Sequence, residues 1–176
     1  FLRNLKAGTT SLVSVGRDGV GGARGDSWGP VVSPSGRYVA FTSAARNIVP
    51  ADRNEASDVF LRDVRQGTTT LVSVSRNGKR TGSGASVALG VSASGRYVLF
   101  TSRADNVAPG DGNGTDDILL RDVRDAVTKI VSVNRNGRSA NGPSSAASLS
   151  SDGRFVLFAS RATNLQTTPV TGLGDV

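Results

Sequence analysis

The stretch from Ser33 to Ser43 reads Ser-Pro-Ser-Gly-Arg-Tyr-Val-Ala-Phe-Thr-Ser, and it decides the fold of this chain. Its first four residues carry Pro and Gly at the second and fourth positions, as a type I turn prefers. From Tyr38 onward, aromatic, β-branched and small residues follow a period of two, which is typical of a strand and not of a helix. The stretch therefore predicts a tight turn followed by a β-strand.

The same pattern recurs along the chain. Ser92 to Ser102 repeats it after 59 residues, and Gly153-Arg154-Phe155-Val156 repeats its centre after a further 58. A second landmark keeps the 59-residue spacing, in the segments Leu12-Val13-Ser14-Val15, Leu71-Val72-Ser73-Val74 and Ile130-Val131-Ser132-Val133. Each repeat predicts four strands, which in the middle copy cover about 87–92, 96–102, 117–123 and 128–133.

A four-stranded antiparallel repeat of this length indicates a propeller blade, for which periods of about 40 to 50 residues are usual. The surplus lies in two connections, 103–116 and 134–145, which match 44–57 and 75–86 one repeat earlier. A β-helix has much shorter repeats without three hairpins each. The prediction is an all-β propeller segment of three four-stranded blades of about 59 residues. It divides into outer strands at 1–16, repeats at 17–75 and 76–134, and further inner strands and a tail at 135–176.

These motifs carry a family resemblance. Ser33 to Ser43 and Ser92 to Ser102, followed by Asp-Val-Phe-Leu-Arg-Asp at 58–63 and Asp-Ile-Leu-Leu-Arg-Asp at 117–122, resemble the repeat of TolB-like bacterial β-propellers. The resemblance implies a blade fold, an exported setting that is secreted or periplasmic, and an interaction role without naming a partner. Propellers of this family also occur beside hydrolase domains. The third copy departs from the pattern at 167–174.

The composition excludes most catalytic chemistry. Among 176 residues there is no Cys and no His, so thiol nucleophiles, thiolate metal sites and the usual physiological-pH base are missing. Glu55 is the only Glu, and no Gly-x-Ser-x-Gly motif precedes a helix. We expect no enzyme but a binding or assembly module, for a protein or another ligand. The alternatives are an accessory domain of a secreted hydrolase and a lectin-like module for polyanions or carbohydrates.

Charge and hydropathy limit the classes of partner that the chain can have. The 21 Lys and Arg exceed the 14 Asp and Glu, giving a net charge of +7 that would suit a polyanion. The basic residues are spread along the chain without interleaved aromatics, which argues against a nucleic-acid groove. No window approaches the about 18 apolar residues of a membrane span, so no membrane insertion is expected.

One loop carries metal-ligand chemistry. Asp111, Asn113 and Asp117 form an Asp-x-Asn-x-x-x-Asp pattern, and Asp52, Asn54 and Asp58 repeat it 59 residues earlier. Alternating oxygen side chains with a later carboxylate suit Ca²⁺, which takes about 6 to 8 oxygen ligands. Asn and Asp also make such turns without a metal, by hydrogen bonding to the backbone. The pattern leaves a Ca²⁺ site and a plain turn as two interpretations, and the third copy has Gln166, Thr168 and Asp175 instead.

Two further features stand out. Trp28 is the only Trp and has Val87 as its counterpart, so it is either a ligand-binding residue or a contact to a neighbouring blade. Arg37, Arg96 and Arg154 follow the turn glycine in every repeat, which favours a structural part such as pairing with Asp63 or Asp122, or stacking on neighbouring strands.

The register of the repeats predicts an incomplete ring. Read tail to head, Asp175-Val176 would continue in register into Phe1, and propellers close with about 4 to 8 blades. We therefore expect a homo-oligomer, most simply six blades from two chains, or other propeller blades that complete the ring. The absence of Met indicates a processed, excised or partial chain.

Overall fold

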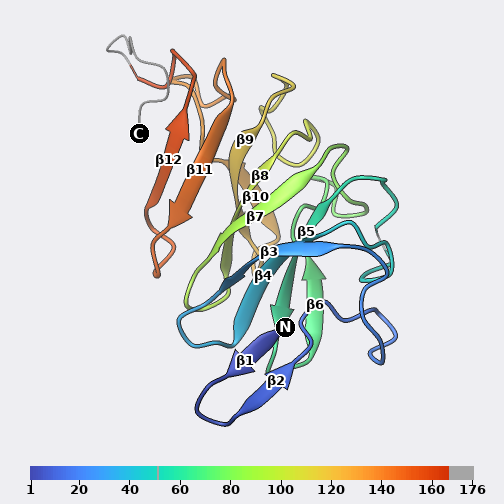
Figure 1. Ribbon diagram of the computed structural model, residues 1–176. Helices are drawn as coiled ribbons and strands as arrows, with labels where there is room; N and C mark the ends of the chain where they lie inside the picture. The colour runs from blue at the N-terminus through green and yellow to red at the C-terminus, as the bar shows by residue number, and fades with distance from the viewer. Residues whose placement is uncertain (51, 167–176) are drawn as a thin grey trace.

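A computed structural model describes residues 1–50 and 52–166. All the regular secondary structure in this part of the chain consists of β-strands (Figure 1). Within these ranges no helix is long and apolar enough to cross a membrane. The twelve strands in chain order are β1 (Leu2–Asn4), β2 (Thr9–Ser11), β3 (Ser27–Val32), β4 (Tyr38–Ser43), β5 (Asp58–Asp63), β6 (Thr68–Leu71), β7 (Ser86–Val91), β8 (Tyr97–Ser102), β9 (Asp117–Asp122), β10 (Val127–Ile130), β11 (Ser144–Leu149) and β12 (Val156–Ser160).

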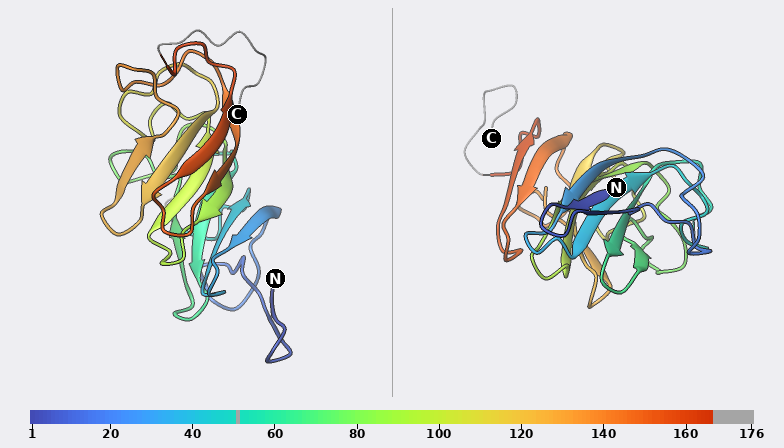
Figure 2. Two further views of the ribbon diagram at one scale, coloured as in Figure 1. Left: turned by 90° about the vertical axis from the view of Figure 1, so that its left-hand side faces the viewer. Right: turned by 60° about the horizontal axis from the view of Figure 1, so that its bottom comes forward.

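The strands form four antiparallel sheets in which each strand pairs with its neighbours in sequence. Strands β3 to β6 form one four-stranded sheet and β7 to β10 another, each with three hairpins, and these are two complete propeller blades. Strands β1 and β2 form a two-stranded sheet, as do β11 and β12. The predicted propeller fold is confirmed, with two blades of four strands flanked by two half-blades (Figures 1 and 2).

The two-residue period of β4 separates the two faces of its sheet. Val39 and Phe41 belong to a cluster on the side of the N-terminal hairpin, where the rings of Phe41 and Phe60 stack with centroids 5.6 Å apart. Ala40 belongs instead to the cluster shared with the second blade, which contains Phe100. Burial on both faces explains why the centres of β4 and β5 are continuously apolar, whereas the outer strand β6 is largely polar.

Turn glycines allow neighbouring blades to approach closely. Gly95 has a φ of +70°, and a Cβ on it would lie 2.5 Å from Cγ of Tyr38 in the preceding blade. Gly153 has a φ of +77° and meets the ring of Tyr97 in the same way. The glycine therefore serves both the turn and the contact between blades.

The strand boundaries differ from the prediction in two places. The outer strand β10 ends at Ile130, short of Val133, because Ser132 is turned inward to hydrogen bond with the start of β9. In the first complete blade the sequence pattern predicts a strand at 30–33, and β3 begins earlier, at Ser27, because a bulge between Trp28 and Val31 lets the pairing continue. The predicted division at residues 17, 76 and 135 stays a prediction, and the counterpart loop around Thr168 and Asp175 lies outside the described residues.

Candidate functional site

The two acidic loops bury the carboxylate that ends each pattern. Asp58 is the first residue of β5 and Asp117 the first of β9, and neither is exposed at all. The hydroxyl of Ser73 donates to Oδ1 of Asp58 at 2.6 Å, and the hydroxyl of Ser132 donates to Oδ1 of Asp117 at 2.6 Å. Each aspartate is thus held in place by one serine of the outer strand segment.

The second oxygen of each buried carboxylate lacks such a partner. Oδ2 of Asp58 and Oδ2 of Asp117 are buried without a hydrogen bond, and so are Oδ1 of Asp52 and Oδ1 of Asp111. Burial, opposed in part by the hydrogen bond from Ser73, raises the pKa of Asp58 to about 7. Burial and the charges of Asp117 and Asp105 raise the pKa of Asp111 to about 6. The structure therefore brings together Asp52 with Asp58 and Asp111 with Asp117.

The two asparagines of the pattern have protein partners. Nδ2 of Asn113 donates to the carbonyl of Ala140 at 2.8 Å, and Nδ2 of Asn54 donates to the carbonyl of Gly82 at 2.9 Å. Oδ1 of Asn113 also accepts from the backbone N–H of Thr115. These amides fasten each loop to the connection that leads into the next blade.

The number of acidic residues in each site limits the chemistry. Within residues 1–50 and 52–166, no three Asp or Glu side chains form a cluster able to hold a metal by themselves. A cation here would need hydroxyl, backbone or water oxygens beside the two carboxylates. The hydroxyl of Thr115 is a candidate, because its buried oxygen has no hydrogen-bond partner.

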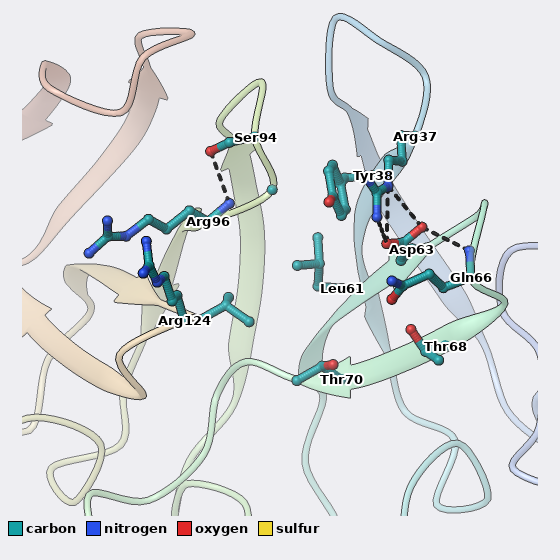
Figure 3. Close-up of a pocket in the computed structure, with 12 residues that line it drawn as sticks. Arg37, Tyr38, Leu61, Asp63, Gln66, Thr68, Thr70, Ser94, Arg96 and Arg124 are labelled. Atoms are coloured by element: carbon teal, nitrogen blue, oxygen red, sulfur yellow. Dashed lines mark hydrogen bonds and ion pairs between the residues drawn. The ribbon is translucent and has the colours of Figure 1, made fainter.

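A groove of about 460 Å³ lies between the two complete blades (Figure 3). Arg37 and Asp63 lie together on one side, and Arg96 and Arg124 lie on the other. Tyr38 and Gly95 are among the residues that line it. The groove is a surface feature with several guanidinium groups and no catalytic constellation.

The recurring arginines make the expected structural contacts. Arg37 pairs with Asp63 and Arg96 with Asp122, both at 2.7 Å, which bears out the predicted ion pairs. The guanidinium of Arg37 lies 4.8 Å from the ring centroid of Tyr38, and Arg154 lies 5.7 Å from that of Phe155. The Arg37 hydrogen bond lowers the pKa of Asp63, and Arg96 lowers that of Asp122 in the same way.

Trp28 lies on β3 at the bulge and is 42% exposed. It lines a small pocket of about 80 Å³ with Phe1, Val13 and Phe41. A pocket of this size takes at most a small group, so its use as a ligand-binding residue stays a prediction.

Sequence reasoning missed the serines that anchor the acidic loops. Ser73 and Ser132 are fully buried and each bonds both a carboxylate and a backbone N–H, of Val59 or Ile118. Their signal was present, since the same serine recurs in Leu-Val-Ser-Val and Ile-Val-Ser-Val at the 59-residue period. A polar residue kept in an apolar segment at the repeat period indicates a buried partner.

Comparisons with known proteins concern the fold. No protein-family model matches the chain, and no curated protein matches it. Among solved structures, TolB from Acinetobacter baumannii matches 78% of this chain at 20% identity with a TM-score of 0.44. A prolyl endopeptidase structure matches 77% at 12% identity with a TM-score of 0.48. The matched regions are 27% and 18% of those longer chains, so this chain spans only a fraction of the structures to which it is similar.

Proposed function

We propose that this chain is a non-catalytic binding or assembly module whose half-blades are completed by further propeller blades, most simply those of a second copy. The observation that carries the proposal is a contact made twice within the chain. Tyr38 covers Gly95, and Tyr97 covers Gly153. Phe155 is the counterpart of these two tyrosines in the third repeat, and it is 67% exposed. Gly36 is the counterpart of the two glycines in the first repeat, and nothing lies within 4 Å of a Cβ placed on it. The exposed ring and the open glycine are complementary, since Phe155 of one copy would cover Gly36 of another as Tyr38 covers Gly95.

The strand edges support the same proposal. In both complete blades the second and third strands pair over six residues, from Tyr38 opposite Asp63 and from Tyr97 opposite Asp122. Within the described residues, β12 pairs only with β11 and β1 only with β2. Pairing β12 of one copy with β1 of another would satisfy both free edges and remove an aggregation hazard.

In the proposed dimer, β11 and β12 of one copy and β1 and β2 of the other form a composite blade. This blade would lack the ion pair that Arg37 and Arg96 make in the complete blades. In the shared register, Asn4 stands where Asp63 and Asp122 stand, so it would lie beside Arg154 without a carboxylate. Oδ1 of Asn4 still accepts from the N–H groups of Lys6 and Ala7, as Oδ1 of Asp63 does from Arg65 and Gln66. The turn is therefore kept while the ion pair is lost.

Light scattering on the purified chain tests the proposal. We expect a mass of twice 18.1 kDa, and Phe155→Arg should shift the population to monomer. Val127→Arg is the matched control, because Val127 is an exposed valine on the outer strand β10. Asn4→Asp should tighten association several-fold by giving Arg154 a partner. A folded monomer at all concentrations, or equal effects of the two arginine variants, would overturn the proposal.

A second candidate is a ligand site in the groove between the blades. Arg37, Arg96 and Arg124 line it beside the ring of Tyr38, a combination that suits a carboxylated or sulfated carbohydrate. A glycan array with salt titration tests this candidate, and Arg124→Ala should lower the signal if the groove is used. The exported setting and the hydrolase accessory role stay predictions.

A further inference from the structure

We propose that the loop between β8 and β9 binds Ca²⁺ through the carboxylates of Asp111 and Asp117. The matching loop between β4 and β5 binds the ion more weakly through Asp52 and Asp58. This inference concerns different surfaces from the assembly contact, so either can fail without the other.

Buried oxygens without partners carry the proposal. Oδ2 of Asp117 has no hydrogen bond although the residue has no exposed surface, and in the same loop Oδ1 of Asp111 and Oγ1 of Thr115 are also buried without partners. A plain turn would direct these oxygens to backbone N–H groups, because a buried acceptor left unpaired costs about 1 to 3 kcal/mol. Hard oxygen ligands in an irregular loop are the donor set that Ca²⁺ takes.

One of the two proposed ligands, Asp111, lies at a surface pocket. It lines this pocket of about 490 Å³ together with Asn113, Asn134 and Arg138. Asn113 fastens the loop to Ala140. Burial raises the pKa of Asp117, and the side-chain amide of Asn113 is among the groups that oppose this rise, so Asn113 acts directly on one of the carboxylates. We assign Asn113 and Asn54 this positioning part, while Asp111 and Asp117 coordinate the ion.

The two loops carry opposite charges at one corresponding position. Asp105 adds a negative charge that acts on both Asp111 and Asp117, and its counterpart in the other loop is Arg46. Burial raises the pKa of Asp52, and the positive charge of Arg46 opposes part of this rise. Arg46 also forms an ion pair with Glu55 at 2.8 Å. A positive charge that acts on Asp52 competes with a bound cation. The loop with Asp105 is therefore the stronger site.

Calorimetric and thermal titration of the metal-free chain tests the site. We expect heat on adding Ca²⁺, a dissociation constant of about 10⁻⁴ to 10⁻³ M as in extracellular modules, and a rise in melting temperature. Asp111→Asn should remove the stronger binding event, whereas the neighbouring control Asp116→Asn should keep it. Mg²⁺ should bind more weakly, since it demands near-octahedral geometry.

A charge swap at the exposed position makes the test sharper, because neither variant disturbs the core. Asp105→Arg should weaken the stronger site by about tenfold, and Arg46→Asp should strengthen the weaker site by a similar factor. The opposing explanation is a proton shared between the two carboxyl groups. No heat with millimolar Ca²⁺ in either the parent chain or Arg46→Asp, or equal stabilisation by Mg²⁺, would overturn the proposal.

Discussion

Strand β8 of the complete blade β7–β10 and strand β12 of the half-blade β11–β12 have similar sequences at corresponding positions, yet their residues have different surroundings. Leu99 in β8 is fully buried, whereas its counterpart Leu157 in β12 is 59% exposed. Tyr97 covers the glycine of the next blade, while Phe155 has no such neighbour among the described residues. The difference teaches that burial in this fold comes from the adjacent blade and not from the strand itself.

The largest expected effect is a difference in stability between alanine variants of the two leucines. Leu99→Ala should lower the free energy of unfolding by about 2 to 5 kcal/mol, as truncation of a buried Leu does, whereas Leu157→Ala should change it by less than about 1 kcal/mol. Urea denaturation of both variants at low protein concentration measures the two values. A cost for Leu157→Ala that rises with protein concentration would place the missing neighbour in another chain, and equal costs at every concentration would contradict the comparison.

A smaller effect is expected at the turn glycines. Gly95 and Gly36 have nearly the same backbone, with φ of +70° and +71°, but only a Cβ at Gly95 would collide with Tyr38. At a protein concentration low enough to keep the chain monomeric, Gly36→Ala should cost about 1 kcal/mol from the positive φ, and Gly95→Ala about 1 to 3 kcal/mol more from overpacking. Thermal unfolding of the pair isolates the contact between blades. Indistinguishable melting temperatures would mean that Tyr38 yields at no cost.

The smallest effect concerns the ion pair that the half-blade lacks. Arg96 lowers the pKa of Asp122 below its unfolded value of 3.8, so this contribution is present above that value and is lost as pH falls through the folded pKa. Asp122→Asn should keep the turn, as Asn4 does at the same position, and remove only this contribution. The difference in melting temperature between parent and Asp122→Asn should therefore shrink below about pH 4. A difference independent of pH would assign the effect of the substitution to packing.

The 59-residue period made most of the fold predictable. The turn at Gly36, the strand from Tyr38 and the four-strand unit all follow from local patterns that need no tertiary information. The end of β10 was wrong, because Ser132 reads as part of a strand until the carboxylate of Asp117 is placed beside it. The pairing of Arg37 with Asp63 was predictable because both residues recur at fixed positions.

The acidic loops were predictable in residue type and not in geometry. The spacing of Asp111 and Asp117 indicated a shared loop, but their burial depends on how the loop packs against the next connection. The contact from Asn113 to Ala140 joins residues 27 positions apart, and no local pattern specifies it. The opposite charges at Arg46 and Asp105 gain meaning only once both positions are placed beside the buried carboxylates.

The sequential strand order within each blade has a consequence for how the chain folds. Because every hairpin joins strands adjacent in sequence, a blade can assemble from short loop closures, which take microseconds or less per step. Pairing of β12 with β1 is different, since in the proposed assembly it joins strands of two molecules. Ring closure would then be the slow step of folding, and between two molecules its rate would depend on their concentration.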